Sequence, residues 1–125
     1  MRILAVDDEP RLTRLITLLL AGHGHDVKAS HSGEDALERL NNEQFDIVLS
    51  NVGLGSGMNG WELDRIVRKR WPNLRFAFAT GWGAQFDEAT ARAAGVDTVL
   101  AKPYSGDDLA RTVGLLAGGR VVDTR

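Results

Sequence analysis

Polar side chains directly follow four of the five apolar runs in this 125-residue sequence. They are Asp7 and Asp8 after the first run, Asn51 after the third, Thr80 after the fourth and Lys102 after the last. If the runs form parallel strands, their carboxyl ends share one edge of a sheet, so these side chains would converge. Paired carboxylates suit Mg²⁺, while an ammonium and a hydroxyl suit a phosphoryl group. The pattern therefore predicts a site for a cation and a phosphoryl group at that edge.

Each of these residues also has a simpler explanation, which the sequence leaves open. Negative side chains are favourable at a helix N-terminus, so Asp7 and Asp8 would also suit the helix that follows them. Thr80 would then be an ordinary strand-end hydroxyl, and Lys102 a solvated surface lysine. Two carboxylates, a hydroxyl and an ammonium at matching strand ends nevertheless favour one shared site.

Apolar runs alternate with helical periodicities along the chain. The expected strands cover Ile3–Val6, Val27–Ser30, Phe45–Ser50, Leu74–Ala79 and Val96–Ala101. Pro10 suits a first helical turn, Ser32 opens a capping-box spacing, and Asn59 begins the next helical pattern. Further helices are expected over Gln85–Ala94 and after Ser105. Five β-α units in strict alternation predict an α/β fold, with helices on both faces of a parallel sheet.

Composition sets broad limits on function. The chain has 43% hydrophobic and 26% charged residues, a formal net charge of −2 and no cysteine. No disulfide, thiolate nucleophile or cysteine-based zinc site is therefore available, and no global attraction to nucleic acid is expected. We expect no membrane span, since no apolar run approaches ~20 residues, and no signal peptide. We expect one domain over residues 1–118, a tail over 119–125 and a cytoplasmic location.

The stretch FDIVLSNVGLGSGMNG, from Phe45 to Gly60, resembles the third strand and following loop of the response-regulator receiver domain. The resemblance extends from Ile3 to about Leu116. It implies a flavodoxin-like (βα)5 three-layer sandwich, with a parallel five-stranded sheet in the order 2-1-3-4-5. It also implies roles for the residues after the strands: metal ligands (Asp7, Asp8, Asn51 and the Gly53 carbonyl), a phosphoacceptor position (Asn51), catalytic groups (Thr80 and Lys102) and switch or neighbouring positions (Gly81, Trp82, Val99 and Pro103).

Position 51 departs from the family, in which an aspartate accepts the phosphoryl group. Asn51 carries a neutral carboxamide, a very poor nucleophile, so phosphorylation there is not expected. The loss of one negative charge should also weaken Mg²⁺ binding. Three origins stay open: an engineered change of a natural aspartate, a natural pseudo-receiver, or an acceptor shifted to Ser50. Ser50 is disfavoured because neighbouring strand residues point to opposite faces.

Two further positions differ from the family or stand out near the expected pocket. Val99 replaces an aromatic residue that often moves with the switch hydroxyl, so this chain cannot signal by that route. Trp82 lies two residues past Thr80, where it either shields the pocket or packs locally.

The sequence thus predicts a receiver domain of bacterial two-component signalling rather than an enzyme. A sensor histidine kinase or histidine phosphotransfer protein would supply the phosphoryl group, and an output protein or domain would read the result, without direct nucleic-acid or membrane contact. The Asn51 form is expected to stay unphosphorylated. The alternatives are a pseudo-receiver acting as a phosphorylation-independent interaction module, and a flavodoxin-like small-molecule binder, which the anionic Asp7-Asp8-Glu9 segment disfavours.

Overall fold

The structure, a computed structural model, describes residues 1–55, 57–80 and 98–101, with side chains as far as Phe78. Its elements are β1 (Arg2–Val6), α1 (Pro10–Ala21), β2 (Asp26–Ser30), α2 (Gly33–Asn42), β3 (Ile47–Ser50), α3 (Gly60–Arg70), β4 (Arg75–Thr80) and β5 (Thr98–Ala101). The helices predicted over Gln85–Ala94 and after Ser105 lie outside the described residues, as does the expected domain boundary at residue 118.

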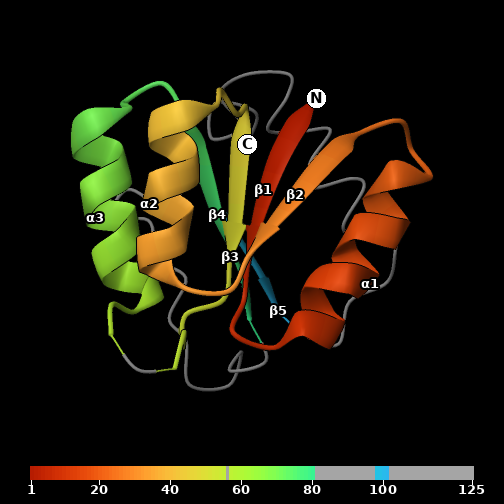
Figure 1. Cartoon of the computed structure of the whole chain (residues 1–125), viewed down its shortest axis with the longest axis horizontal. Coiled ribbons are helices and arrows are strands. Elements are labelled where there is room, and N and C mark those ends of the chain that lie inside the picture. The colour runs from red at the N-terminus through yellow and green to blue at the C-terminus, as the bar shows by residue number, and fades with distance from the viewer. Residues whose placement is uncertain (56, 81–97, 102–125) are drawn as a thin grey trace.

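The described strands form a parallel sheet in the order β2-β1-β3-β4-β5, as the resemblance implied (Figure 1). In the register, Val6 of β1 pairs with Ser30 of β2 and with Ser50 of β3. Ser50 in turn pairs with Phe78 of β4. Because the strands are parallel, the ends of β1, β2 and β3 lie level at one edge of the sheet.

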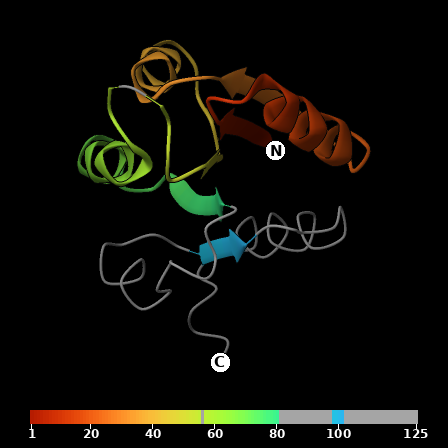
Figure 2. The ribbon, with the colours of Figure 1, turned by 90° about the horizontal axis from the view of Figure 1, so that it is seen from below.

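Both faces of the central strands β1 and β3 are buried, as their continuous apolar runs predict, whereas Asp26 and Lys28 of the edge strand β2 are exposed. Figure 2 shows α1 on one side of the sheet and α2 and α3 on the other. Successive strand residues point to opposite faces. Side chains from Ile3, Ala5, Ile47, Leu49 and Ala77 pack with α1, whereas those of Leu4, Val6, Val48, Phe76 and Phe78 pack with α2 and α3. The predicted flavodoxin-like class, with helical layers on both sides of a parallel sheet, is confirmed.

Side chains cap the N-termini of α2 and α3. The Asn59 side chain accepts a hydrogen bond from Glu62 N at 2.9 Å, and the Glu62 side chain accepts one from Asn59 N at 2.9 Å. Ser32 Oγ accepts from Asp35 N at 3.0 Å, which is half of the same motif. These bonds satisfy N–H groups that lack a partner within the helix. The Asn59 cap therefore fixes the point where α3 begins.

Replacing Asn59 with alanine is expected to lower the free energy of unfolding by about 1 kcal/mol, because the Glu62 N–H loses its acceptor. Urea unfolding followed by circular dichroism measures the loss. Asn73→Ala is the matched control, since Asn73 is exposed, and its effect should stay within about 0.5 kcal/mol. A loss at Asn59 no larger than that at Asn73 would contradict the capping role.

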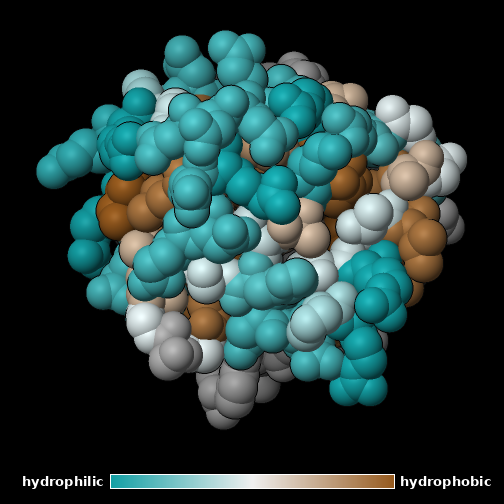
Figure 3. All heavy atoms as spheres, viewed as in Figure 1, coloured by the Kyte–Doolittle hydropathy of each residue, from teal (hydrophilic) through white to brown (hydrophobic). Residues whose placement is uncertain are grey.

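Hydrophilic residues dominate the face of the molecule seen in Figure 3. The large apolar side chains exposed in the described part of the chain are Leu15 and Leu18 of α1, which are 47% and 67% exposed. Within that same part, every helix is too short or too polar to cross a lipid bilayer.

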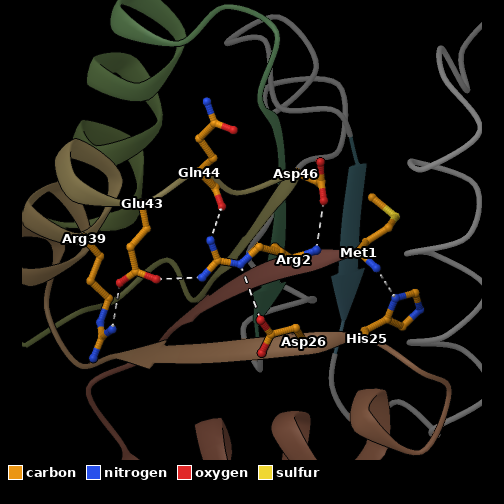
Figure 4. A network of polar contacts seen from close by, with 8 residues as sticks. All are labelled: Met1, Arg2, His25, Asp26, Arg39, Glu43, Gln44 and Asp46. Atoms are coloured by element: carbon orange, nitrogen blue, oxygen red, sulfur yellow. Dashed lines mark hydrogen bonds and ion pairs between the residues drawn. The ribbon is translucent and has the colours of Figure 1, made fainter.

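A polar network ties together the amino ends of β1, β2 and β3, at the edge opposite to Asp7 (Figure 4). The Arg2 guanidinium donates to Glu43 Oε1 at 2.7 Å and to the Gln44 carbonyl at 2.9 Å, and lies 3.4 Å from Asp26 Oδ2. The hydrogen bond to Glu43 and the two neighbouring carboxylates raise the pKa of Arg2. A cavity of about 600 Å³ lies beside the network, but its lining groups include Arg2, Glu43 and Gln44, which are bonded to one another. This network therefore holds the strands together, and the Arg2 and Glu43 side chains in it are already paired with each other.

Candidate functional site

Backbone hydrogen bonds hold Asp7 and Asn51 at the carboxyl edge of the sheet. Asn51 N donates to the Val6 carbonyl at 2.9 Å, and Asp7 N donates to the Ser30 carbonyl at 3.1 Å. Val6 and Ser50 are register partners, so the first residue after β1 lies beside the first residue after β3. The structure thus brings the positions of Asp7 and Asn51 together.

The two carboxylates after β1 differ in their surroundings. Asp7 is only 3% exposed, and its Oδ1 accepts a hydrogen bond from Glu9 N at 3.0 Å. Asp8 is exposed. The β3–α3 loop (residues 51–59) passes close to it, since a Cβ on Gly55 would lie 3.1 Å from Asp8 Oδ2. Gly55 has a φ of +75°, a conformation that glycine adopts at little cost, so this approach depends on glycine.

The Asn51 carboxamide is turned toward its own loop. Its Nδ2 donates to the Gly53 carbonyl at 2.9 Å. Its Oδ1 is buried and has no hydrogen-bond partner among the described residues. The opposite orientation of the amide would place two oxygens at that separation, and their partial negative charges would repel. An N–H group, and not an oxygen, therefore faces the Gly53 carbonyl.

Ser50 lies on the other face of the sheet from Asn51. Its side chain is fully buried, and its Oγ donates to the Asn51 carbonyl at 2.8 Å. Val48, two residues earlier, packs in the core shared with α2 and α3, so Ser50 points the same way. A hydroxyl in that position gives no support to a shifted phosphoacceptor.

The remaining predicted site residues lie within β4 and β5 or follow these strands in the sequence. Thr80 is the last residue of β4 and pairs with Ala101, the last of β5. Because Ser50 pairs with Phe78, β4 runs two residues beyond the end of β3 at the same edge. The described residues do not include the side chains of Thr80 and Val99, nor Gly81, Trp82, Lys102 and Pro103. Their roles stay predictions.

A divalent cation fits the described residues poorly. Mg²⁺ takes oxygen ligands, and carboxylates hold it best. Asp7 and Asp8 supply two carboxylates, but the Gly53 carbonyl, the expected backbone ligand, is bonded to the amide of Asn51. Over the residues that the structure describes, no group of three or more acidic, histidine or cysteine side chains could hold a metal ion. At this edge the described residues thus supply two carboxylates and a hydrogen-bonded carbonyl, one carboxylate fewer than with an aspartate at position 51.

The sequence patterns missed the residue that ties the β3–α3 loop to α2. Glu34 Oε2 accepts a hydrogen bond from Met58 N at 3.1 Å. The same loop is also held by the buried Leu54 side chain, and by Gly60 N, which donates to the Val52 carbonyl at 2.7 Å. No spacing could signal the Glu34 bond, because it joins residues 24 apart in the sequence.

Helix α3 begins at Gly60, a position with room only for glycine. A Cβ on Gly60 would lie 2.5 Å from the Asn51 carbonyl oxygen and 2.8 Å from the Phe78 ring. Phe78 is fully buried and meets Trp61 edge-on, with their ring centroids 4.9 Å apart. The absence of a side chain at Gly60 therefore lets α3 start directly against the backbone of position 51.

Comparisons with known proteins point to one family. A family model described as the response regulator receiver domain matches residues 3–114. The transcriptional regulatory protein TrcR of Mycobacterium tuberculosis is 34% identical over 116 residues, which are 92% of this chain and 45% of TrcR. The sensor histidine kinase RcsC of Salmonella typhi is 34% identical over 125 residues, which are 100% of this chain and 13% of RcsC. The chain thus spans less than half the length of either relative.

A solved structure agrees in fold. The response regulator protein TrrA from Thermotoga maritima, in complex with Mg²⁺-BeF, is 26% identical with a TM-score of 0.83. The match covers 92% of this chain and 97% of that one.

Proposed function

Because this chain belongs to the response regulator receiver domain family, we propose that it serves a two-component phosphorelay through protein contacts and accepts no phosphoryl group at position 51. Receiver domains are signalling modules. With an aspartate at position 51, the same scaffold would accept a phosphoryl group from a kinase histidine and change its contacts. The Asn51 form stays in the unphosphorylated state.

One observation carries the proposal: Asn51, the first residue after β3, bears a carboxamide. An aspartate attacks phosphorus through a carboxylate oxygen and forms an acyl phosphate. In Asn51 the amide N–H is bonded to the Gly53 carbonyl, and the amide oxygen is neutral and buried. Neither atom can act as the nucleophile that phosphoryl transfer needs.

The proposed partners are a sensor histidine kinase or histidine phosphotransfer protein, and an output protein or domain. Relatives named as a transcriptional regulatory protein and as a sensor histidine kinase support both kinds of partner. In this role the chain works in the cytoplasm and catalyses no reaction of its own. Thr80 and Lys102 would contact the phosphoryl group only where position 51 is an aspartate.

Incubated with acetyl phosphate and Mg²⁺, the unaltered chain is expected to gain no phosphoryl mass, because position 51 lacks a nucleophile. Intact-mass spectrometry measures this. A receiver domain that has an aspartate at the acceptor position, in the same reaction, is the positive control. Added phosphoryl mass on this chain would contradict the proposal, and fragment masses would then show whether Ser50 or another residue is the acceptor.

The second candidate function is a constitutive protein-interaction module. In that case the parent protein also lacks the acceptor aspartate and never uses phosphate, whereas the first candidate descends from a protein that is phosphorylated at position 51. The Asn51–Gly53 hydrogen bond favours it, because that bond holds the loop without phosphate or a cation. The source gene separates the two candidates. An aspartate codon at position 51 would mean a phosphate-dependent parent protein, and an asparagine codon would favour the constitutive module.

A further inference from the structure

We infer that the Asn51 side chain takes the place of a bound cation. Its N–H group holds the Gly53 carbonyl, which in a receiver of this family would be a ligand of Mg²⁺. The β3–α3 loop therefore keeps its shape without a metal ion. This inference deepens the proposed function, and rests on it only for the choice of Mg²⁺ as the cation replaced.

The first support is the geometry of the amide. The 2.9 Å separation of Asn51 Nδ2 and the Gly53 carbonyl oxygen is that of an ordinary N–H···O hydrogen bond. An aspartate in the same position would bring a carboxylate oxygen against that carbonyl oxygen. Two oxygens so close repel unless a positive charge lies near both. In this chain the amide hydrogen of Asn51 carries a partial positive charge, and it faces the Gly53 carbonyl oxygen in place of a cation.

The second support is the balance of charge at the edge. Asp7 is buried and already accepts a hydrogen bond from Glu9 N, while Asp8 is exposed to water. Because position 51 is an asparagine, Asp7, Asp8 and Asn51 together contribute two carboxylates to this edge instead of three. Fewer like charges have to be offset, so the need for a cation is smaller.

The third support is that contacts within the protein hold described residues of the loop on both sides of Gly55. Leu54 is buried in the core, Met58 N is bonded to Glu34, and Gly60 N is bonded to the Val52 carbonyl. None of these contacts involves the acidic edge. The loop therefore has its own anchors on both sides of Gly55, and the Asn51 amide completes them at the end next to β3.

Thermal unfolding in EDTA and in rising concentrations of Mg²⁺ tests the inference. The unaltered chain should keep one unfolding midpoint throughout. Asn51→Asp should unfold at a lower temperature in EDTA and gain stability with the logarithm of the Mg²⁺ concentration, because a cation that binds only the folded state stabilises it. Asn59→Asp is the matched control, since it makes the same exchange at an exposed helix cap, and should behave like the unaltered chain.

A second measurement needs no variant. Hydrogen exchange by NMR should show the Asn51 side-chain NH₂ exchanging about fivefold more slowly than that of the exposed Asn73, because it is hydrogen-bonded, and Mg²⁺ should not change this. Equal exchange rates at the two residues would overturn the inference. The inference would also be overturned if the unfolding temperature of the unaltered chain rose with Mg²⁺ as steeply as that of Asn51→Asp. Neither measurement involves acetyl phosphate, so the inference and the proposed function can fail separately.

Discussion

Asn51→Asp is expected to turn a chain that takes no phosphoryl group into one labelled by acetyl phosphate, from undetectable labelling to most of the molecules. The backbone of position 51 is already held by its hydrogen bond to Val6, so the new carboxylate would stand at the end of β3. Its charged oxygen can attack phosphorus and form an acyl phosphate. Intact-mass spectrometry after incubation with acetyl phosphate and Mg²⁺ measures the gain.

Asn59→Asp separates the effect of position from that of charge. It adds the same carboxylate to the same loop, and aspartate caps a helix about as well as asparagine, so this variant should fold normally and remain unlabelled. Leaving out Mg²⁺ should abolish labelling of Asn51→Asp, because three carboxylates at one edge repel an incoming phosphoryl group. No added mass on Asn51→Asp with Mg²⁺ present would show that position 51 is not an acceptor position, and the roles proposed for Asp7 and Asp8 would fall with it.

Gly60→Ala is expected to lower the free energy of unfolding by about 3 kcal/mol, as overpacking at a buried contact does. The added Cβ would lie 2.5 Å from the Asn51 carbonyl oxygen and 2.8 Å from the Phe78 ring. Neither neighbour can move easily, since one is backbone at a strand end and the other is a fully buried ring. Helix propensity alone predicts the opposite sign, because alanine is the better helix former. Urea unfolding measures the change.

Gly22→Ala provides the comparison for that result. Gly22 follows α1 with a φ of −63°, and a Cβ there would be 3.5 Å from its nearest neighbour, an ordinary contact. This substitution should change the free energy of unfolding by no more than about 0.5 kcal/mol. If Gly60→Ala proved as mild as Gly22→Ala, the close contact between the start of α3 and position 51 would be refuted.

The elements were predictable where local signals are strong. The apolar run Ile3–Val6 predicted a strand buried on both faces, and Pro10 marked the first residue of α1 correctly. The start predicted for β3 was wrong by two residues. Phe45 lies under the Arg2 guanidinium, and the Asp46 carboxylate accepts from Arg2 N, so both residues serve contacts at the amino edge before the strand begins. Such contacts depend on a neighbouring strand and leave no local pattern.

The sequence predicted that Asp7 and Asn51 lie together at the carboxyl edge of the sheet, but not how their side chains are arranged. Asp7 and Asp8 look equivalent in the sequence, yet Asp7 is buried and Asp8 is exposed. Asp7 N donates to the Ser30 carbonyl and so continues the pairing of β1 with β2. Asn51 could be identified as a poor nucleophile from its type alone. The direction of its amide follows from where the chain returns at Gly53, which no spacing reveals.

The main chain at position 51 is fixed by Val6 on one side and by the contact with Gly60 on the other, and neither contact uses the side chain. Asparagine and aspartate have nearly the same shape, so either can occupy this position without a new backbone path. A single substitution at this position therefore exchanges a neutral carboxamide for a charged carboxylate, while the Asn51 N–H bond to the Val6 carbonyl can persist unchanged.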